Sequence, residues 1–478
     1  MDVHRYDPSR LETIEAWGRN KAAAGYVFRP STVDGVREVI SFAQHNNYRV
    51  VLRGAGRSYG DASLGSEQLI LDVTRLNRVL NWNLDTGVVE CEAGVTIEQL
   101  WKYCIGDGWW PPVVSGTMAP TLAGALGMNI HGKNNFKVGT IGEHVTELDV
   151  IIADGQCLTC SPTIQSDIFH AVIGGFGSLG VITRVVLQMK RVYSGKLLVD
   201  PIYAKNIDHM FTIFEQRIPD ADYLVGWIDA FASGDSLGRG QVHQANYVTS
   251  TNPTQSLRVQ AQDLPDNIFG IIPKSILWRF MKPFVNDTGM KLINWAKATA
   301  SRLKDGVVHE ESHAGFAFLL DYVPNWKLAY GDEGLIQYQA FVPAGSAKQC
   351  FKTILERCQN AGLVPYLAVF KQHRMDPFLM THAVDGFSLA LDFRLTTANR
   401  KRVWALAAEL DALLLSSSGR FYFAKDATLS ADRISDYLGE ARVQQFLALK
   451  RAIDPAGIFR TDLFERIFGD AWSGSGGA

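Results

Sequence analysis

Three clusters of glycine in the first 180 residues are the first features of this chain that could do chemistry. The first cluster, Gly54-Ala55-Gly56-Arg57-Ser58-Tyr59-Gly60-Asp61, directly follows a β-branched stretch at 48–53. Glycine tolerates positive φ and lets the backbone approach a ligand closely. Successive free N–H groups in such a loop could bind an anion such as a pyrophosphate. A tight structural turn explains the same residues equally well.

The spacing of this cluster argues against the common dinucleotide-binding turn. That turn has the pattern G-x-G-x-x-G and leads into a helix whose N-terminus holds the pyrophosphate. Here the spacing is G-x-G-x-x-x-G, and residues 61–65 lack the pattern of an amphipathic helix. A nucleotide bound at this cluster would therefore be held by a loop.

The second and third clusters favour a cofactor site over a plain turn. In the second cluster, at 121–134, Gly124, Ala125 and Gly127 leave a surface with few side chains, as a planar cofactor requires. The third cluster, at 174–180, again joins a loop to a strand. Three such loops in one region exceed what a fold alone requires, so we interpret them as parts of one site.

Two side chains could move protons. Lys425 stands in Tyr-Phe-Ala-Lys-Asp, and its apolar neighbours would desolvate the amine, lower its pKa and suit it to proton transfer. The alternative is an ordinary surface lysine paired with Asp426. His131 lies in the second cluster, where it could contact a ligand or serve only as a hydrogen-bonded loop residue.

Other polar and aromatic residues could line a pocket. Gln337 and Gln339 are two apart on an expected strand, so their side chains share a face. Lys371 ends an apolar stretch and could donate a hydrogen bond to a ligand. Trp227 and Tyr422 could form walls, although aromatic side chains more often pack in a core.

Two arrangements that suggest metal binding are poor candidates. Cys157 and Cys160 fall within an expected strand, where residues three apart point to opposite faces, and no second Cys or His pair lies nearby. His309 and His313 lack the residue spacing of a zinc protease motif.

The composition is that of an ordinary folded protein. The 478 residues are 47% hydrophobic and 20% charged, with a formal net charge of −2. This balance excludes binding of nucleic acid or of an anionic membrane through bulk positive charge. No stretch reaches the ~18–20 apolar residues of a membrane span. The N-terminus lacks a secretory pattern, so we expect a cytoplasmic protein with reduced cysteines.

Strands and helices alternate through the first third of the chain. We expect a helix beginning at Val33, a helix capped by Thr96 with Gln99, and helices at 347–360 and 399–414. Strands are expected at 48–53, 69–73, 88–91, 148–153 and 181–189. Glycine clusters stop near residue 193, where a second domain would begin.

These motifs resemble the vanillyl-alcohol-oxidase-type (PCMH-type) FAD-binding superfamily. Within it, they are most similar to the decaprenylphosphoryl-ribose 2′-oxidase family, whose members are the FAD subunit of an epimerase. The matching motifs occur in order along nearly the whole chain: WGR at 17–19, GRSYGD at 56–61, NIHGKN at 129–134, LGR at 237–239, QYQ at 337–339, VFK at 369–371 and YFAKD at 422–426.

The resemblance implies a role for each matching residue. The implied FAD-binding residues are Arg53, Gly54, Ala55, Gly56, Arg57, Ser58, Tyr59, Gly60, Asp61, Gly116, Thr117, Thr121, Gly124, Met128, Asn129, Ile130, His131, Ile182 and Tyr422. The implied substrate-binding residues are Lys133, Trp227, Gln337, Gln339, Lys371 and Lys425. Lys425, His131 and Tyr59 are the implied catalytic residues, and no metal is expected.

Departures from the superfamily bear on how FAD is held. Many members attach FAD through a histidine in the first loop, where this chain has Arg57. Others use a cysteine before the second loop, where this chain has Ala119 and Pro120. We therefore expect non-covalent FAD. Some close relatives also carry a cysteine near the flavin at the position of Ala390.

The expected fold is α+β with two domains. Residues 1–195 together with 418–478 would form the FAD-binding domain, and residues 196–417 a substrate (cap) domain with an antiparallel sheet. The cluster expected to face the flavin from the second domain comprises Trp227, Gln337, Gln339, Lys371 and Asp392.

The implied reaction oxidises a CH–OH group of a sugar or sugar derivative to a ketone by hydride transfer to flavin. A soluble aldonolactone or alditol oxidase that uses oxygen is one alternative, and a non-catalytic flavin-binding scaffold is another. Implied partners are a sugar or lipid-linked sugar and a reductase that completes an epimerisation. We expect no nucleic acid and at most a peripheral membrane contact.

Overall fold

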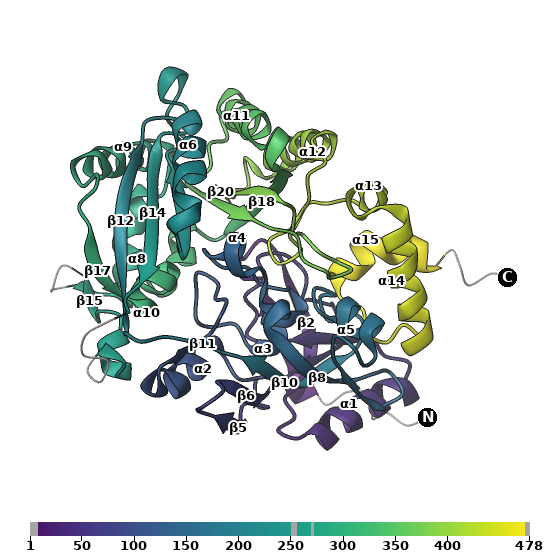
Figure 1. Ribbon diagram of the computed structural model, residues 1–478. Coiled ribbons are helices and arrows are strands. Elements are labelled where there is room, and N and C mark those ends of the chain that lie inside the picture. Colours follow the sequence, from purple (N-terminus) through teal and green to yellow (C-terminus); the bar gives the residue numbers. More distant parts are fainter. Residues whose placement is uncertain (1–7, 250–255, 269–271, 474–478) are drawn as a thin grey trace.

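The computed structural model describes residues 8–249, 256–268 and 272–473 (Figure 1). A seven-stranded sheet faces two smaller sheets that are built from the first 190 residues. The C-terminal helices return to the smaller sheets. The chain thus forms two halves, one built around the seven-stranded sheet and the other around the two smaller sheets.

The first sheet has four strands and one helix. Thr32 begins α1 (Val33–His45), because its side chain accepts a hydrogen bond from Gly35 N–H. The strand order is β1-β2-β4-β3. The strands are β1 (Leu11–Glu15), β2 (Ala22–Phe28), β3 (Val50–Arg53) and β4 (Leu69–Asp72). β3 and β4 are parallel, and the first glycine cluster follows directly from the end of β3.

The second sheet is antiparallel, with the order β5-β6-β10-β8-β9. Its strands are β5 (Val79–Asn83), β6 (Val88–Glu92), β8 (Val145–Ile151), β9 (Cys157–Cys160) and β10 (Val181–Gln188). Its helices are α2 (Ile97–Cys104), α3 (Leu122–Gly127), α4 (Asn135–Val138) and α5 (Ser166–Val172), and β7 (Trp109–Trp110) pairs with β11 (Lys190–Arg191). The capping box expected at Thr96 and Gln99 is present. Helix α3 was not expected, because six residues with two glycines show no amphipathic period.

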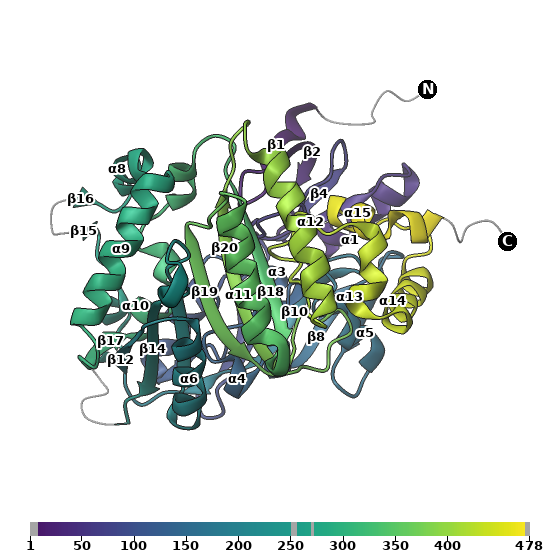
Figure 2. The ribbon, with the colours of Figure 1, turned by 90° about the horizontal axis from the view of Figure 1, so that it is seen from above.

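The third sheet is antiparallel throughout, in the order β17-β12-β14-β13-β19-β20-β18. Its strands are β12 (Lys196–Ala204), β13 (Tyr223–Ile228), β14 (Gly240–Tyr247), β17 (His309–Ser312), β18 (Leu335–Pro343), β19 (Leu367–His373) and β20 (Gly386–Arg394). Helices α6 (Ile207–Arg217), α11 (Ala344–Asn360) and α12 (Arg400–Ser416) contact it (Figure 2). Eight of nine residues in both β18 and β20 are buried, so both faces of these strands are covered.

A smaller group of elements lies beside β12 and β14. It comprises β15 (Asn267–Ile268), β16 (Ile272–Pro273), α8 (Leu277–Met281), α9 (Asp287–Leu303) and α10 (His313–Ala317). Helix α9 contacts both β12 and β14.

The C-terminal segment holds the third glycine cluster in place. It contains α13 (Ile434–Leu438), α14 (Glu440–Ile453) and α15 (Asp462–Ser473). Lys450 is fully buried, pairs with Asp454, and donates hydrogen bonds of 2.7 Å to the carbonyls of Ser178 and Phe459. A buried lysine needs such partners, so this contact is specific.

The expected α+β class is confirmed. Within the described ranges, no helix has both the length and the apolar character that crossing a membrane requires.

Candidate active site

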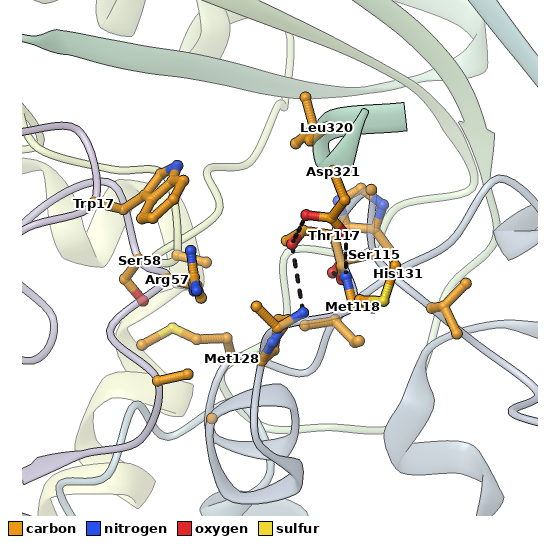
Figure 3. A pocket seen from close by; sticks show the side chains of 18 of the residues that line it. Trp17, Arg57, Ser58, Ser115, Thr117, Met118, Met128, His131, Leu320 and Asp321 are labelled. Carbon is orange, nitrogen blue, oxygen red and sulfur yellow. Dashed lines mark hydrogen bonds between the residues drawn. The ribbon is translucent and has the colours of Figure 1, made fainter. Parts of the chain in front are cut away.

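A cavity of about 970 Å³ lies where the seven-stranded sheet faces the glycine clusters. This volume is at the upper end of the ~300–1,000 Å³ typical of ligand pockets. All three clusters line one side, and strands β13, β14, β18, β19 and β20 line the other. Figure 3 shows the part where Arg57 and Ser58 lie across from Thr117, Met118 and Asp321.

The first and second glycine loops are in direct contact. A Cβ atom at Gly54 would lie 2.2 Å from Thr121 Oγ1, so only glycine fits there. Gly56 has a φ of +61°, in the left-handed region that side chains disfavour. Thr121 is fully buried, and its hydroxyl accepts a hydrogen bond from Gly124 N–H at 3.1 Å. These glycines therefore leave bare backbone along the cavity.

The cavity wall has the donors that a dinucleotide cofactor requires. Two buried nitrogens on this wall, Arg57 Nε and His131 Nδ1, have no hydrogen-bond partner within the described residues. The Arg57 guanidinium carbon lies 4.3 Å from the centroid of the Trp17 ring. Burial lowers the pKa of Arg57 from its usual value, and Asp321 opposes this change. The residues present thus fit FAD, with bare backbone and an arginine for phosphate and unpaired donors for the ring.

A short 3-10 helix from the other half of the molecule, Leu319–Asp321, packs over residues 116–118 of the cavity wall. Asp321 accepts hydrogen bonds from Thr117 Oγ1 at 2.7 Å and from Met118 N–H at 2.8 Å (Figure 3). Leu320 N–H donates to Gly116 O at 3.1 Å. Burial raises the pKa of Asp321, although both hydrogen bonds oppose the rise. The short 3-10 helix Leu319–Asp321 therefore covers the cavity beside Arg57.

Lys425 occupies the part of the cavity beside Tyr59. Its Nζ lies 3.6 Å from the centroid of the Tyr59 ring. Burial lowers the pKa of Lys425 to about 7, while Asp392 opposes and Lys371 assists this change. Asp392 lies behind the cavity wall, fully buried, and accepts a hydrogen bond from Gln337 Nε2. Burial raises the pKa of Asp392 to about 6. Because the pKa of Lys425 is itself about 7, its amine can gain or lose a proton near neutral pH.

Two more lysines line the same cavity. Burial lowers the pKa of Lys133 to about 7 and the pKa of Lys371 to about 8. Lys133 Nζ donates to the carbonyl of Phe316 and lies 4.1 Å from the centroid of that ring. Neither these two lysines nor Lys425 forms an ion pair within the part of the chain that the structure describes. The wall therefore carries three buried amines without a direct ion pair, although Glu311 and Asp392 act to raise the pKa of Lys133 and of Lys425.

A chain of hydrogen bonds fixes the tautomer of His131. Asn135 Oδ1 accepts from a backbone N–H at 3.3 Å, so it also accepts from His373 Nδ1–H at 3.0 Å. His373 Nε2 then accepts from the Ser388 hydroxyl at 2.7 Å. Gln339 Nε2 donates to Ser388 Oγ at 3.5 Å and to His131 Nε2 at 3.2 Å. The proton of His131 is therefore on Nδ1, and burial keeps its pKa well below the usual range.

The structure brings most of the expected site residues together on the cavity wall. They are Arg53, Gly54, Ala55, Gly56, Arg57, Ser58, Tyr59, Gly116, Thr117, Thr121, Gly124, Met128, Ile130, His131, Lys133, Ile182, Trp227, Gln337, Gln339, Lys371, Tyr422 and Lys425. Ala390 also lines the cavity, where some relatives carry a cysteine.

Three residues expected to bind FAD do not line the cavity. Gly60 packs against the backbone of the C-terminal segment, where a Cβ would lie 2.0 Å from a carbonyl oxygen. Asp61 forms an ion pair with Arg466 at 2.9 Å. Asn129 Nδ2 donates to Asp376 at 3.0 Å. These residues hold the loops in position, which explains why they occur within the motifs.

Several residues at the site escaped the sequence analysis. Ser388 could have been found, because it is two residues from Ala390 and so shares its face of the strand. Lys297 and Asp321 also line the cavity, but they come from an α-helix and a 3-10 helix whose positions over the cavity no sequence pattern indicates.

Comparison with known proteins accounts for this arrangement. A family described as FAD binding domain matches residues 24–161, the region of the first two glycine clusters. The chain contains an FAD-binding domain. It is 28% identical to decaprenylphosphoryl-beta-D-ribose oxidase of Mycolicibacterium smegmatis over 96% of this chain and 98% of that protein.

Two other enzymes match part of the chain. The chain is 28% identical to L-gulonolactone oxidase of Bos taurus over 39% of this chain and 41% of that protein. It is also 28% identical to D-lactate dehydrogenase of Archaeoglobus fulgidus over 39% of this chain and 43% of that protein. The flavoprotein is an oxidoreductase, and the expectation of FAD as its cofactor is confirmed.

Proposed function

We propose that this flavoprotein oxidises a CH–OH group of a phosphate-bearing sugar derivative to a ketone. The observation that carries the proposal is the pair of buried amines of Lys133 and Lys371, which form no ion pair with a carboxylate in the described ranges. A ligand phosphate would favour their charged forms and repay their burial. A neutral lactone or alditol would leave this charge uncompensated. The full-length similarity to a decaprenylphosphoryl-ribose oxidase supports the same substrate class.

Each of these residues has a distinct role in the proposed mechanism. Bound FAD would supply the hydride acceptor, and the protein supplies position, proton transfer and charge. The amine of Lys425, neutral above about pH 7, accepts the proton of the substrate hydroxyl. Lys133 and Lys371 bind the phosphate as point charges. The Gln339 side chain and the Nδ1–H of His131 orient the sugar and the flavin where the two react.

We also propose how the chain is divided and how it holds FAD. The FAD-binding domain comprises residues 1–195 with 418–478, and the substrate domain comprises residues 196–417. Arg57, Ala119 and Pro120 supply no side chain that attaches to flavin, which supports non-covalent binding. Denaturation should therefore release all of the flavin into a protein-free filtrate.

Partners and location follow from the proposed substrate class. The keto product would pass to a reductase that completes an epimerisation. A lipid-linked substrate would bring the protein to a membrane surface as a peripheral protein. The cytoplasmic location expected from the sequence stays a prediction, which cell fractionation tests.

Anaerobic bleaching of the flavin absorbance tests the proposal. The panel is a polyprenyl-phosphate pentose, a pentose 1-phosphate, the unphosphorylated pentose and an aldonolactone. We expect fast bleaching by the lipid-linked pentose, weaker bleaching by the pentose 1-phosphate and none by the two neutral compounds. Faster bleaching by the lactone would favour the lactone oxidase. Bleaching by none of the four, with FAD bound, would favour the scaffold protein.

A variant links the assay to the lysines. Lys371→Met should raise KM for the pentose phosphate about tenfold or more, since a charge-assisted hydrogen bond contributes about 1.5–3 kcal/mol. An unchanged KM would remove this lysine from the phosphate site. Peroxide release during turnover reports whether oxygen is the acceptor.

A further inference from the structure

Helix α9 has an apolar face that points away from the protein. Its inward face is formed by Asn294, Ala298 and Ser301, which are buried, and Ser301 Oγ donates to Gln241 of β14 at 3.0 Å. Residues three and four apart share one face of a helix, so the opposite face carries Leu292, Ile293, Ala296, Ala300 and Leu303. All five are exposed. A surface helix normally shows polar residues there.

The exposure of this face is large. The exposed fractions are 61% for Leu292, 45% for Ile293 and 80% for Leu303. Trp295, beside them, is 55% exposed. The preceding segment adds Phe280 at 57% and Phe284 at 56%. In Figures 1 and 2, α9 lies at the end of the molecule opposite to α14 and α15.

The same segment is basic, although the chain as a whole is slightly acidic. Residues 277–304 contain six Lys or Arg and one acidic residue, Asp287, whereas the whole chain has 47 Lys or Arg and 49 Asp or Glu. The six are Arg279, Lys282, Lys291, Lys297, Arg302 and Lys304. None of them forms an ion pair within the described residues. Lys291 and Arg302 lie on the flank of α9 that carries Trp295, whereas Lys297, on the other flank, turns its amine into the cavity.

We propose that residues 277–304, here named the α8–α9 face, dock on the surface of an anionic lipid bilayer. Exposed aromatic and aliphatic side chains flanked by Lys and Arg are typical of helices that lie in a membrane interface. Each basic side chain near such a surface contributes about 1 kcal/mol. A second copy of this chain fits less well, since a two-fold contact would bring like charges together.

The position of this face relates docking to the active site. Lys297 lines the cavity, and its Nζ lies 4.1 Å from the centroid of the Trp227 ring on β13. The helix that contacts the bilayer would therefore also form the cavity wall. Docking in this position could deliver a lipid-linked sugar from the bilayer to the cavity. Only that delivery rests on the proposed function, because docking itself needs no substrate.

Co-sedimentation with vesicles tests docking in the FAD-loaded, full-length protein. One set of vesicles contains phosphatidylcholine and phosphatidylglycerol in equal amounts, and the other contains phosphatidylcholine alone. We expect binding to the mixed vesicles that weakens as salt rises. Lys291→Glu with Arg302→Glu should lower the partition coefficient at least about 25-fold, because each lost cation accounts for about fivefold, or 1 kcal/mol. Leu292→Gln with Leu303→Gln should also weaken binding.

Matched controls distinguish docking from misfolding and from failure of the proposed function. Leu84 is also exposed, at 57%, and lies outside this face, so Leu84→Gln should bind as the wild type does. All variants should retain FAD and the same rate of flavin reduction by a soluble substrate. Equal vesicle binding by the wild type and the double variants would overturn the proposal. Equal binding to vesicles with and without phosphatidylglycerol would also overturn it. A dimer that the leucine variant converts to a monomer would assign the face to a second copy.

Discussion

Replacement of Lys425 by methionine should make the protein more stable and almost inactive. Methionine keeps the length of the side chain and its contact with Tyr59, but removes the amine. The Nζ of Lys425 lies 3.6 Å from the ring centroid of Tyr59, and no acceptor within the described residues satisfies its charge. A buried amine that has no direct ion pair, and only Asp392 at longer range, destabilises the folded state, whereas a thioether does not.

The magnitude follows from the pKa of the lysine. A shift from 10.5 to about 7 corresponds to about 5 kcal/mol, at about 1.36 kcal/mol for each pKa unit. The side chain retains partial access to the cavity and a contact with an aromatic ring, so we expect a net gain of about 1–3 kcal/mol. The unfolded chain binds more protons than the folded one between pH 7 and 10.5, so the wild type becomes more stable as pH rises through this window. The advantage of Lys425→Met should shrink in parallel.

Two measurements check this prediction. Urea unfolding of the FAD-free protein, at neutral pH and at the alkaline end of that window, gives the free energy of unfolding of both proteins. Stopped-flow reduction of the FAD-loaded proteins should show a loss of about 10²–10⁴-fold, the usual contribution of a general base. Lys371→Met is the matched control, because it also removes a buried cavity amine but not the proton acceptor. A Lys425→Met protein that reduces its flavin at the wild-type rate would refute the proposed role, and a less stable one would refute the reasoning on burial.

Three further variants test other parts of the site. Gly56→Val should lose FAD, because φ is +61° there and an added Cβ would lie 2.3 Å from the guanidinium of Arg53 on the cavity wall. Gly106→Val, with no atom within 4 Å of an added Cβ, should remain yellow. Asp392→Asn removes a carboxylate that raises the pKa of Lys425, so the acid limb of the pH profile of flavin reduction should move to lower pH. An unmoved acid limb would mean that Asp392 does not influence the titration of Lys425. Ser388→Ala should shift the ¹⁵N resonances of His131 towards a mixture of tautomers and slow flavin reduction about fivefold, or about 1 kcal/mol. Ser388→Thr keeps the hydroxyl and should restore both. Unchanged resonances in Ser388→Ala would mean that the hydrogen-bond chain does not set the tautomer.

Local patterns were sufficient to predict most elements near the cofactor. The capping box of Thr96 and Gln99 begins a helix because its two hydrogen bonds form within four residues. The glycine clusters indicated the cavity walls because glycine is required where a Cβ would collide with a neighbour. At Gly54, for example, a Cβ would collide with Thr121. Helix α3 was missed, since its small residues give no periodic signal and its position depends on contact with β10.

The sequence by itself determined which chemistry the chain could perform: bare loops for a dinucleotide, and lysines next to apolar neighbours. These properties depend on residues adjacent in the chain. Only the tertiary structure decided which amines share one cavity, that Asp392 stands behind Lys425, and that Asp321 closes over Thr117. It also decided that α9 turns an apolar face outward. Such contacts join residues that are far apart in the chain, as Thr117 and Asp321 are, and pKa values and exposed faces depend on the neighbours that folding supplies.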